Sequence, residues 1–215
     1  MDTAFARRQM VRQQVRTWDV FDEDTLALMN RLNRHDFVPD GYADLAYADA
    51  PIPLPHGEEM MVPLIEGRVL QALDPQADER VLEIGSGSGF FAACLASLAD
   101  SVLTVDLYED MVEMARHNLA HANIENVEVR QMNALKELPE ERFDVVAVTG
   151  SIAQFDERLV DALAPGGRMF VVVGEDPVME AWLVTKDTDG WHHEVIFETT
   201  LKALVDGERE NRFVF

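Results

Sequence analysis

The stretch Val81-Leu82-Glu83-Ile84-Gly85-Ser86-Gly87-Ser88-Gly89 decides the fold of this chain. It joins an apolar run, an acidic residue and three glycines at alternate positions, and the apolar segment 90–95 follows it. Apolar runs interrupted by glycine in this way predict a strand, a tight turn and a helix. Glycine permits a positive φ and lets a ligand lie against the main chain, while the start of the helix offers free N–H groups. The stretch therefore predicts a site for a nucleotide-like cofactor.

Beyond residue 80, strand-like apolar runs alternate with helical periods. We expect strands at 80–84, 101–106, 126–131, 143–149 and 168–173, and helices at 89–98, 109–122 and 155–163. Such alternation is typical of an α/β fold in which helices cover both faces of a parallel sheet. After Gly174 the pattern changes to two strands near 180–186 and 191–199, and the turn residues 187–190 predict a hairpin between them.

The N-terminal part has a different organisation. Helical periods and a capping aspartate, Asp22, predict one helix from Asp2 to about Trp18 and another through about Asn33. The proline-rich stretch 39–58 predicts an ordered loop or extended segments, and 62–73 predicts a helix that leads into the first strand of the sheet. We expect residues 1–60 to form an N-terminal helical and substrate-loop extension, and residues 61–215 to form the cofactor-binding domain.

The composition excludes several classes of function. A net charge of −22 repels phosphate backbones, so nucleic acid is not expected as a partner. No apolar stretch approaches the roughly 20 residues of a membrane span, and the N-terminal residues lack an apolar signal core, so we expect a cytoplasmic protein. Cys94 is the only cysteine, which excludes an internal disulfide, and we expect no metal site. The acidic surface is equally consistent with a salt-adapted cytoplasm and with an ordinary soluble protein.

The polar residues at the strand ends indicate which cofactor is bound. The glycine spacing is G-x-G-x-G rather than the G-x-G-x-x-G of dinucleotide folds. Asp106 ends the second strand about 20 residues after Gly85, where a carboxylate can accept hydrogen bonds from both ribose hydroxyls. It can also cap the helix that follows. Asn133 follows the third strand, where its polar side chain can contact the edge of an adenine ring. This combination favours S-adenosyl-L-methionine over a nicotinamide cofactor.

Each candidate cofactor residue has an expected role. We expect the glycine turn to hold the methionyl part, Asp106 to hold the ribose and the third strand end to flank the adenine. The candidates for these contacts are Glu83, Gly85, Ser86, Gly87, Gly89, Asp106, Leu107, Asn133, Ala134 and Thr149.

Several further motifs resemble the protein-L-isoaspartate O-methyltransferase family. They are Met10-Val11-Arg12-Gln13-Gln14-Val15-Arg16, Arg34-His35-Asp36-Phe37-Val38-Pro39, Ala46-Tyr47-Ala48-Asp49-Ala50-Pro51-Ile52-Pro53-Leu54, the glycine motif, Phe143-Asp144-Val145-Val146-Ala147-Val148-Thr149 and Leu163-Ala164-Pro165-Gly166-Gly167-Arg168. The resemblance covers roughly residues 8–175. It implies a Rossmann-like class I methyltransferase with a seven-stranded, mostly parallel sheet and helices on both faces. It also implies S-adenosyl-L-methionine as donor and a carboxylate of damaged aspartyl residues in proteins as acceptor.

One loop departs from the family pattern. Where the family has a catalytic Thr-Ile-Ser, this chain has Glu59 at the threonine position and Met61 at the serine position. By resemblance these are the catalytic-loop positions, and we expect Asp49, His56, Glu58 and Ser151 to contact the acceptor. A carboxylate acceptor is already ionised near pH 7, so the reaction needs no general base.

The two glutamates of this loop leave alternatives open. If Glu58 and Glu59 face the site, each would oppose an anionic acceptor by about 3 kcal/mol at about 5 Å. A neutral or cationic small molecule or another protein group would then suit the site better. Alternatively, both glutamates are solvated, or the chain is a non-catalytic S-adenosylmethionine-binding module. The sequence leaves the oligomeric state open.

Overall fold

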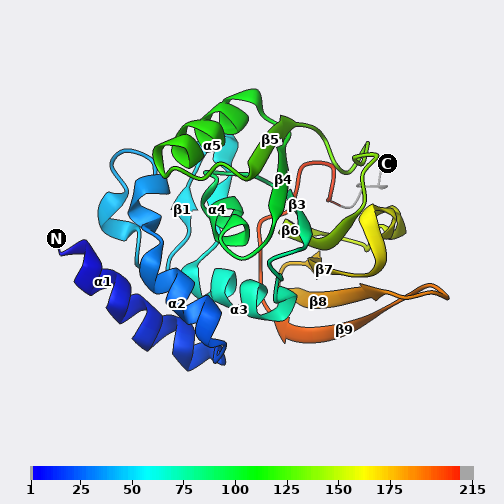
Figure 1. The fold of residues 1–215 in the computed structure, drawn as a ribbon, viewed down its shortest axis with the longest axis horizontal. Helices are drawn as coiled ribbons and strands as arrows, with labels where there is room; N and C mark the ends of the chain where they lie inside the picture. Colours follow the sequence, from blue (N-terminus) through cyan, green and yellow to red (C-terminus); the bar gives the residue numbers. More distant parts are fainter. Residues whose placement is uncertain (1, 209–215) are drawn as a thin grey trace, which may run out of the picture.

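The computed structural model describes residues 2–208 and contains a seven-stranded sheet in the order β5-β4-β3-β6-β7-β8-β9 (Figure 1). Its strands are β3 (Arg80–Ile84), β4 (Ser101–Asp106), β5 (Val127–Gln131), β6 (Phe143–Ile152), β7 (Leu163–Glu175), β8 (Val178–Lys186) and β9 (Trp191–Glu198). Neighbouring strands from β5 to β7 are parallel, whereas the β7–β8 and β8–β9 pairs are antiparallel. The predicted mostly parallel α/β sheet and its hairpin are thus confirmed.

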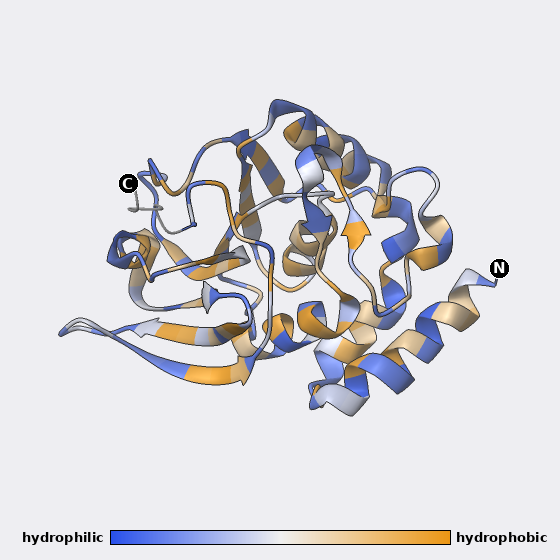
Figure 2. Ribbon diagram, turned by 180° about the vertical axis from the view of Figure 1, so that it is seen from behind, coloured by the Kyte–Doolittle hydropathy of each residue, from blue (hydrophilic) through white to orange (hydrophobic). Residues whose placement is uncertain are grey.

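Successive residues of the central strands enter two different hydrophobic cores. Val81 and Val102 pack with residues of α3 (Pro63–Leu73), α4 (Phe90–Ala96) and α5 (Glu109–His121) on one face. Leu82 and Leu103 belong to the core of the opposite face, which the 3-10 helix η6 (Glu157–Ala162) helps to cover. Figure 2 shows hydrophobic residues concentrated in the strands and in α4, with hydrophilic stripes along the outer helices. The central strands of the sheet are therefore buried on both faces.

The segment between β6 and β7 differs from the prediction. The predicted helix at 155–163 is the short 3-10 helix η6, and β7 begins at Leu163 instead of residue 168. Residues 165–167 form a bulge within β7, where the pairing with β6 shifts register between Phe143 and Val145.

The N-terminal helix also differs from the prediction. It is α-helical over α1 (Thr3–Met10), widens to a π-turn at η1 (Val11–Val15) and ends as the 3-10 turn η2 (Arg16–Trp18). The next helix, α2 (Glu23–Arg31), begins as predicted, with the Asp22 side chain accepting from the Thr25 N–H at 2.6 Å. A Cβ on Gly67 of α3 would lie 2.7 Å from Val15. The π-turn thus packs against α3 at a position that only glycine accommodates.

A loop held by one buried ion pair connects α2 to α3. It contains η3 (Arg34–Phe37), η4 (Ala43–Leu45), β1 (Ile52–Pro53), η5 (Pro55–Gly57) and β2 (Glu59–Met60), and β1 pairs with β2. Arg34, 1% exposed, donates to the carbonyls of Ala46 and Met61 at 2.9 and 2.6 Å. It also pairs with Glu66 of α3 at 3.1 Å. We call residues 52–61 the β1–β2 loop; Arg34 fixes it to α3.

The division into residues 1–60 and 61–215 stays a prediction, and residues 209–215 of the second part lie outside the described residues. Between residues 2 and 208, no helix combines the length and apolar character needed to cross a bilayer. Over that same range, no three His, Cys, Asp or Glu side chains come together as a metal site would require. The expected independence from metals stays a prediction.

Candidate functional site

The glycine turn after β3 lines a cavity at the carboxyl ends of β3, β4 and β6. Gly85 and Gly87 have φ values of +103° and +51°, a region that other residues enter only with strain. A Cβ on Gly85 would collide with the hydroxyl of Thr149, which lies 2.9 Å from the carbonyl oxygen of Ile84. The structure brings the following predicted cofactor residues into this one cavity: Gly85, Gly87, Asp106, Leu107, Asn133, Ala134 and Thr149.

Asp106 connects the second strand end to the glycine turn. One carboxylate oxygen accepts from the Gly87 N–H at 3.0 Å and the other accepts from the Tyr108 N–H at 3.2 Å. Burial raises the pKa of Asp106, and the backbone N–H groups partly offset this rise. Tyr108 rather than Asp106 is the N-cap residue of α5. Asp106 is therefore held by backbone donors at the cavity wall, where its carboxylate can also meet a ligand hydroxyl.

Glu83 lies fully buried beneath the turn. Its Oε2 accepts from the Thr104 hydroxyl at 2.5 Å, and Thr104 lies 2.8 Å from the Ser86 hydroxyl. Burial raises the pKa of Glu83 to about 8. Its Oε1 has no hydrogen-bond partner within residues 2–208. Glu83 and Ser86 line a smaller adjoining cavity together with Glu66, so a buried carboxylate oxygen there is open to a cationic or hydrogen-bond-donating group.

The far wall of the cavity comes from a segment that the sequence analysis missed. Residues 201–205 line the cavity, because Ser151 at the end of β6 exchanges backbone hydrogen bonds with Lys202 and Leu204 at 2.9 Å each. Asn133 donates to Asp206 at 2.8 Å, which ties the third strand end to the same segment. No periodic pattern in the sequence marks these residues, since their pairing depends on contacts with β6 far away in the chain.

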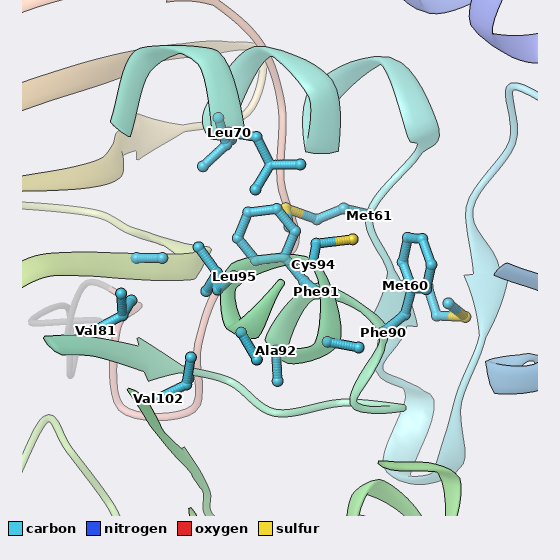
Figure 3. Packing of buried hydrophobic residues seen from close by; sticks show 14 of the residues in the cluster. Met60, Met61, Leu70, Val81, Phe90, Phe91, Ala92, Cys94, Leu95 and Val102 are labelled. Carbon is cyan, nitrogen blue, oxygen red and sulfur yellow. The ribbon is translucent and has the colours of Figure 1, made fainter. Parts of the chain in front are cut away.

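Glu58, Glu59 and Met61 of the β1–β2 loop form another wall of the cavity. Burial is the largest cause of the raised pKa of Glu58, and the neighbouring Asp106 and Glu59 add to it. Glu59 is exposed, whereas Met61 is 9% exposed and lies with Phe91 and Cys94 in the core beneath α3 (Figure 3). Glu59 and Met61 also line a second cavity, together with Trp18, Asp49, Arg68, Val178 and Phe197. The predicted catalytic-loop positions thus lie where the two cavities meet.

The structure places three predicted residues outside the linings of these cavities, and each has another contact. A Cβ on Gly89 would lie 3.2 Å from the main chain of Ala115, so this glycine allows α4 and α5 to pack closely. The Ser151 hydroxyl donates to the Leu201 carbonyl at 2.9 Å. His56 stacks on Tyr108 at 3.8 Å and its Nε2 lies 2.8 Å from Asp110. These residues shape the walls of the site rather than facing its interior.

Two solved structures share the fold of this chain. A Plasmodium falciparum structure described as a protein-L-isoaspartate O-methyltransferase was solved in complex with S-adenosyl-L-homocysteine. It superposes on this chain with a TM-score of 0.77 at 20% identity. The match covers 92% of this chain and 97% of that one. A second structure described as a protein-L-isoaspartate O-methyltransferase gives a TM-score of 0.79 at 22% identity over 92% of this chain and 65% of its own. These likenesses show the fold.

Sequence comparisons extend the likeness from fold to family. The family model described as protein-L-isoaspartate(D-aspartate) O-methyltransferase matches residues 6–208. The protein-L-isoaspartate O-methyltransferase of Methanoculleus marisnigri is 37% identical over 169 residues, 78% of this chain and 77% of the relative. The protein of that name from Aeropyrum pernix is 37% identical over 190 residues, 86% of this chain and 73% of the relative. This chain therefore belongs to the protein-L-isoaspartate(D-aspartate) O-methyltransferase family.

Proposed function

We propose that this protein transfers a methyl group from S-adenosyl-L-methionine to the free carboxylate of isoaspartyl residues in damaged proteins. The observation that carries the proposal is a single cavity in which the Gly85–Gly87 turn and Asp106 meet the β1–β2 loop. Family membership and the S-adenosyl-L-homocysteine in the Plasmodium falciparum structure support the same donor.

The residues of the cavity fit this donor. Gly85 and Gly87 have no side chain to cover their main chain, so the methionyl part of the donor can lie directly against it. The Asp106 carboxylate suits the two ribose hydroxyls, and Leu107, Asn133 and Ala134 suit the adenine. The unpartnered Oε1 of Glu83 in the adjoining cavity suits an ammonium group. When bound, the donor supplies an electrophilic methyl group on a sulfonium.

The protein's own contribution is positioning and dehydration. The acceptor carboxylate is already anionic near neutral pH, so no side chain has to remove a proton from it. Apolar walls from Leu54, Met61 and Leu204 reduce the water around the reacting groups. The second cavity opens beside Glu59 and Met61 and carries Trp18 and Val178, 54% and 69% exposed, at its wall. These exposed apolar residues suit contact with a polypeptide segment whose carboxylate reaches into the first cavity.

The direct test is methylation of an isoaspartyl peptide with labelled donor. We expect a base-labile methyl ester on that peptide and none on the same peptide with an ordinary aspartate. A protein that binds S-adenosyl-L-homocysteine but methylates neither peptide would contradict the proposed acceptor and leave the donor assignment standing.

A second candidate function is methyl transfer to a neutral or cationic acceptor. The observation that favours it is the position of Glu58 and Glu59 in the cavity wall, where both carboxylates would attract a cation. A screen of labelled donor against a cell lysate, run beside the isoaspartyl peptide, separates the two acceptors. A lack of turnover on any acceptor would favour a binding module.

The proposed function also concerns where the protein acts in the cell and on which class of partner. We infer that the protein acts in protein repair in the cytoplasm and does not act on nucleic acid, which the net charge of −22 would repel. Fractionation of cells with an antibody to the protein tests the location.

A further inference from the structure

The cavity at the glycine turn, which we call the main cavity, has one basic side chain among several carboxylates in the part of the chain that the structure describes. Glu58, Glu59 and Asp106 line it, and of the lining residues that the structure describes, Lys202 alone is a lysine or arginine. An anionic acceptor has to enter a space with this charge distribution. Without a cation nearby, each carboxylate would oppose its entry.

Lys202 reaches across the cavity from the segment that follows β9 to the β1–β2 loop. Its backbone carbonyl accepts from the Ser151 N–H at 2.9 Å, which fixes the start of its side chain beside the end of β6. Its ammonium donates to the Gly57 carbonyl and lies 3.9 Å from a carboxylate oxygen of Glu58. A lysine ammonium has three N–H donors, and the Gly57 carbonyl takes one of them. The side chain is 39% exposed, so the remaining donors are accessible to a ligand.

Arg68, the other cation near the acceptor path, is already engaged. Its guanidinium stacks on the Phe197 ring at 4.3 Å and donates to the Ile196 carbonyl at 3.3 Å. It lies in the wall of the second cavity and not in that of the first. Arg68 therefore lies beside the cavity expected to hold the chain of a polypeptide acceptor, whereas Lys202 lines the cavity expected to hold the reacting carboxylate.

The positions expected to donate hydrogen bonds to the acceptor carry no such donor here. Met61 has no N–H or O–H group in its side chain, and an ionised Glu59 only accepts. Because a carboxylate needs donors or a positive charge when it leaves water, another group has to supply them.

We propose that Lys202 binds the carboxylate of the acceptor through a charge-assisted hydrogen bond and so replaces the missing hydroxyl donors of the β1–β2 loop. This assignment rests on the proposed isoaspartyl acceptor. It makes Lys202 an acceptor-binding residue that selects a carboxylate over a neutral group. Its salt link to Glu58 then keeps the ammonium at the cavity when no acceptor is bound.

The test compares two peptides that differ only at the reacting group. One contains isoaspartate and the other isoasparagine, in which a neutral amide replaces the carboxylate. Binding of each is measured by calorimetry in the presence of S-adenosyl-L-homocysteine, for the wild type and for Lys202→Met, Lys202→Arg and Arg142→Met. Arg142 is exposed and precedes β6 at the opposite end of that strand from the cavity, so its substitution is a matched loss of charge.

We expect Lys202→Met to weaken binding of the isoaspartyl peptide at least about tenfold, with KM rising more than kcat falls. Its affinity for the isoasparaginyl peptide and for S-adenosyl-L-homocysteine should match the wild type. Lys202→Arg and Arg142→Met should retain isoaspartyl binding.

Two results would overturn the inference while leaving the proposed function intact. In the first, the wild type methylates isoaspartyl peptide and Lys202→Met binds it equally well. In the second, Lys202→Met weakens both peptides equally, which would mean that the lysine only holds the loop. A wild type that neither binds nor methylates the isoaspartyl peptide would overturn the proposed function and the inference together.

Discussion

At the scale of single residues, Asp106 is the side chain whose loss should affect the donor most. Its carboxylate lines the cavity and is held by the Gly87 and Tyr108 N–H groups. We expect Asp106→Ala to weaken S-adenosyl-L-homocysteine binding by more than about tenfold. The reason is that the carboxylate no longer accepts the two charge-assisted hydrogen bonds expected from the ribose hydroxyls. Calorimetry measures this, with Asp100→Ala, an exposed aspartate just before the same strand, as the control. Equal affinity in the Asp106 variant would refute the ribose assignment.

Glu83 should make the stability of the ligand-free protein depend on pH. Burial raises its pKa from 4.5 to about 8, so between these values the folded protein keeps a proton that the unfolded chain has released. The free energy of unfolding therefore falls with rising pH by up to about 1.4 kcal/mol per unit across that window. We expect Glu83→Gln to be stabilised relative to the wild type at pH 8.5 and to lose this advantage near pH 5. Denaturant unfolding at several pH values measures it, and a constant difference between the two proteins would contradict it.

At the scale of elements, the buried pair Arg34–Glu66 should hold the β1–β2 loop on α3. Both side chains are at most 2% exposed, and Arg34 also binds the carbonyls of Ala46 and Met61. We expect Glu66→Leu or Arg34→Met to lower the free energy of unfolding by about 3–5 kcal/mol, since either leaves an uncompensated buried charge. The double variant Arg34→Met with Glu66→Leu should lower the free energy of unfolding by less than the sum of the two single losses. Additive losses in the double-mutant cycle would show that the pair is not coupled.

The β1–β2 loop should also limit turnover of an anionic acceptor. Glu59 is exposed at the junction of the two cavities, so Glu59→Thr removes a charge without disturbing the core. We expect the substitution to raise kcat/KM for isoaspartyl peptide by about tenfold or more. Met61→Ser is less informative, because Met61 is buried and its loss would cost stability. An exposed glutamate outside the loop, Glu109→Thr, is the control. Unchanged kinetics in Glu59→Thr would mean that its carboxylate points to solvent.

The strands could be predicted from sequence because their residues carry the signal themselves. Runs such as Val145–Val148 are apolar throughout, as expected for strands buried on both faces. The glycine turn and Asp106 were also predictable, since main-chain geometry requires glycine and strand ends meet at one edge of the sheet. The wall 201–205, the bulge at Gly166 and the π-turn at Val11–Val15 were not. Each depends on partners far away in the chain, which a local pattern does not contain.

At the scale of the whole molecule, the net charge of −22 should make stability depend on salt. Like charges repel more strongly in the compact state than in the unfolded chain. Raising sodium chloride from about 0.1 M to about 1 M shortens the Debye length from about 10 Å to about 3 Å and screens this repulsion. We therefore expect the melting temperature to rise with salt, as scanning calorimetry can show. A level or falling melting temperature would mean that ion pairs such as Arg168–Glu79 outweigh the repulsion.

The wall formed by residues 201–205 has a consequence for biosynthesis. Of all the described residues that line the main cavity, these are the last that the ribosome adds. A nascent chain that ends before residue 201 already contains all seven strands of the sheet and the glycine turn, but it lacks this wall of the cavity. Because a ligand stabilises only the state that binds it, a donor that contacts this wall stabilises the protein fully only once residues 201–205 are in place.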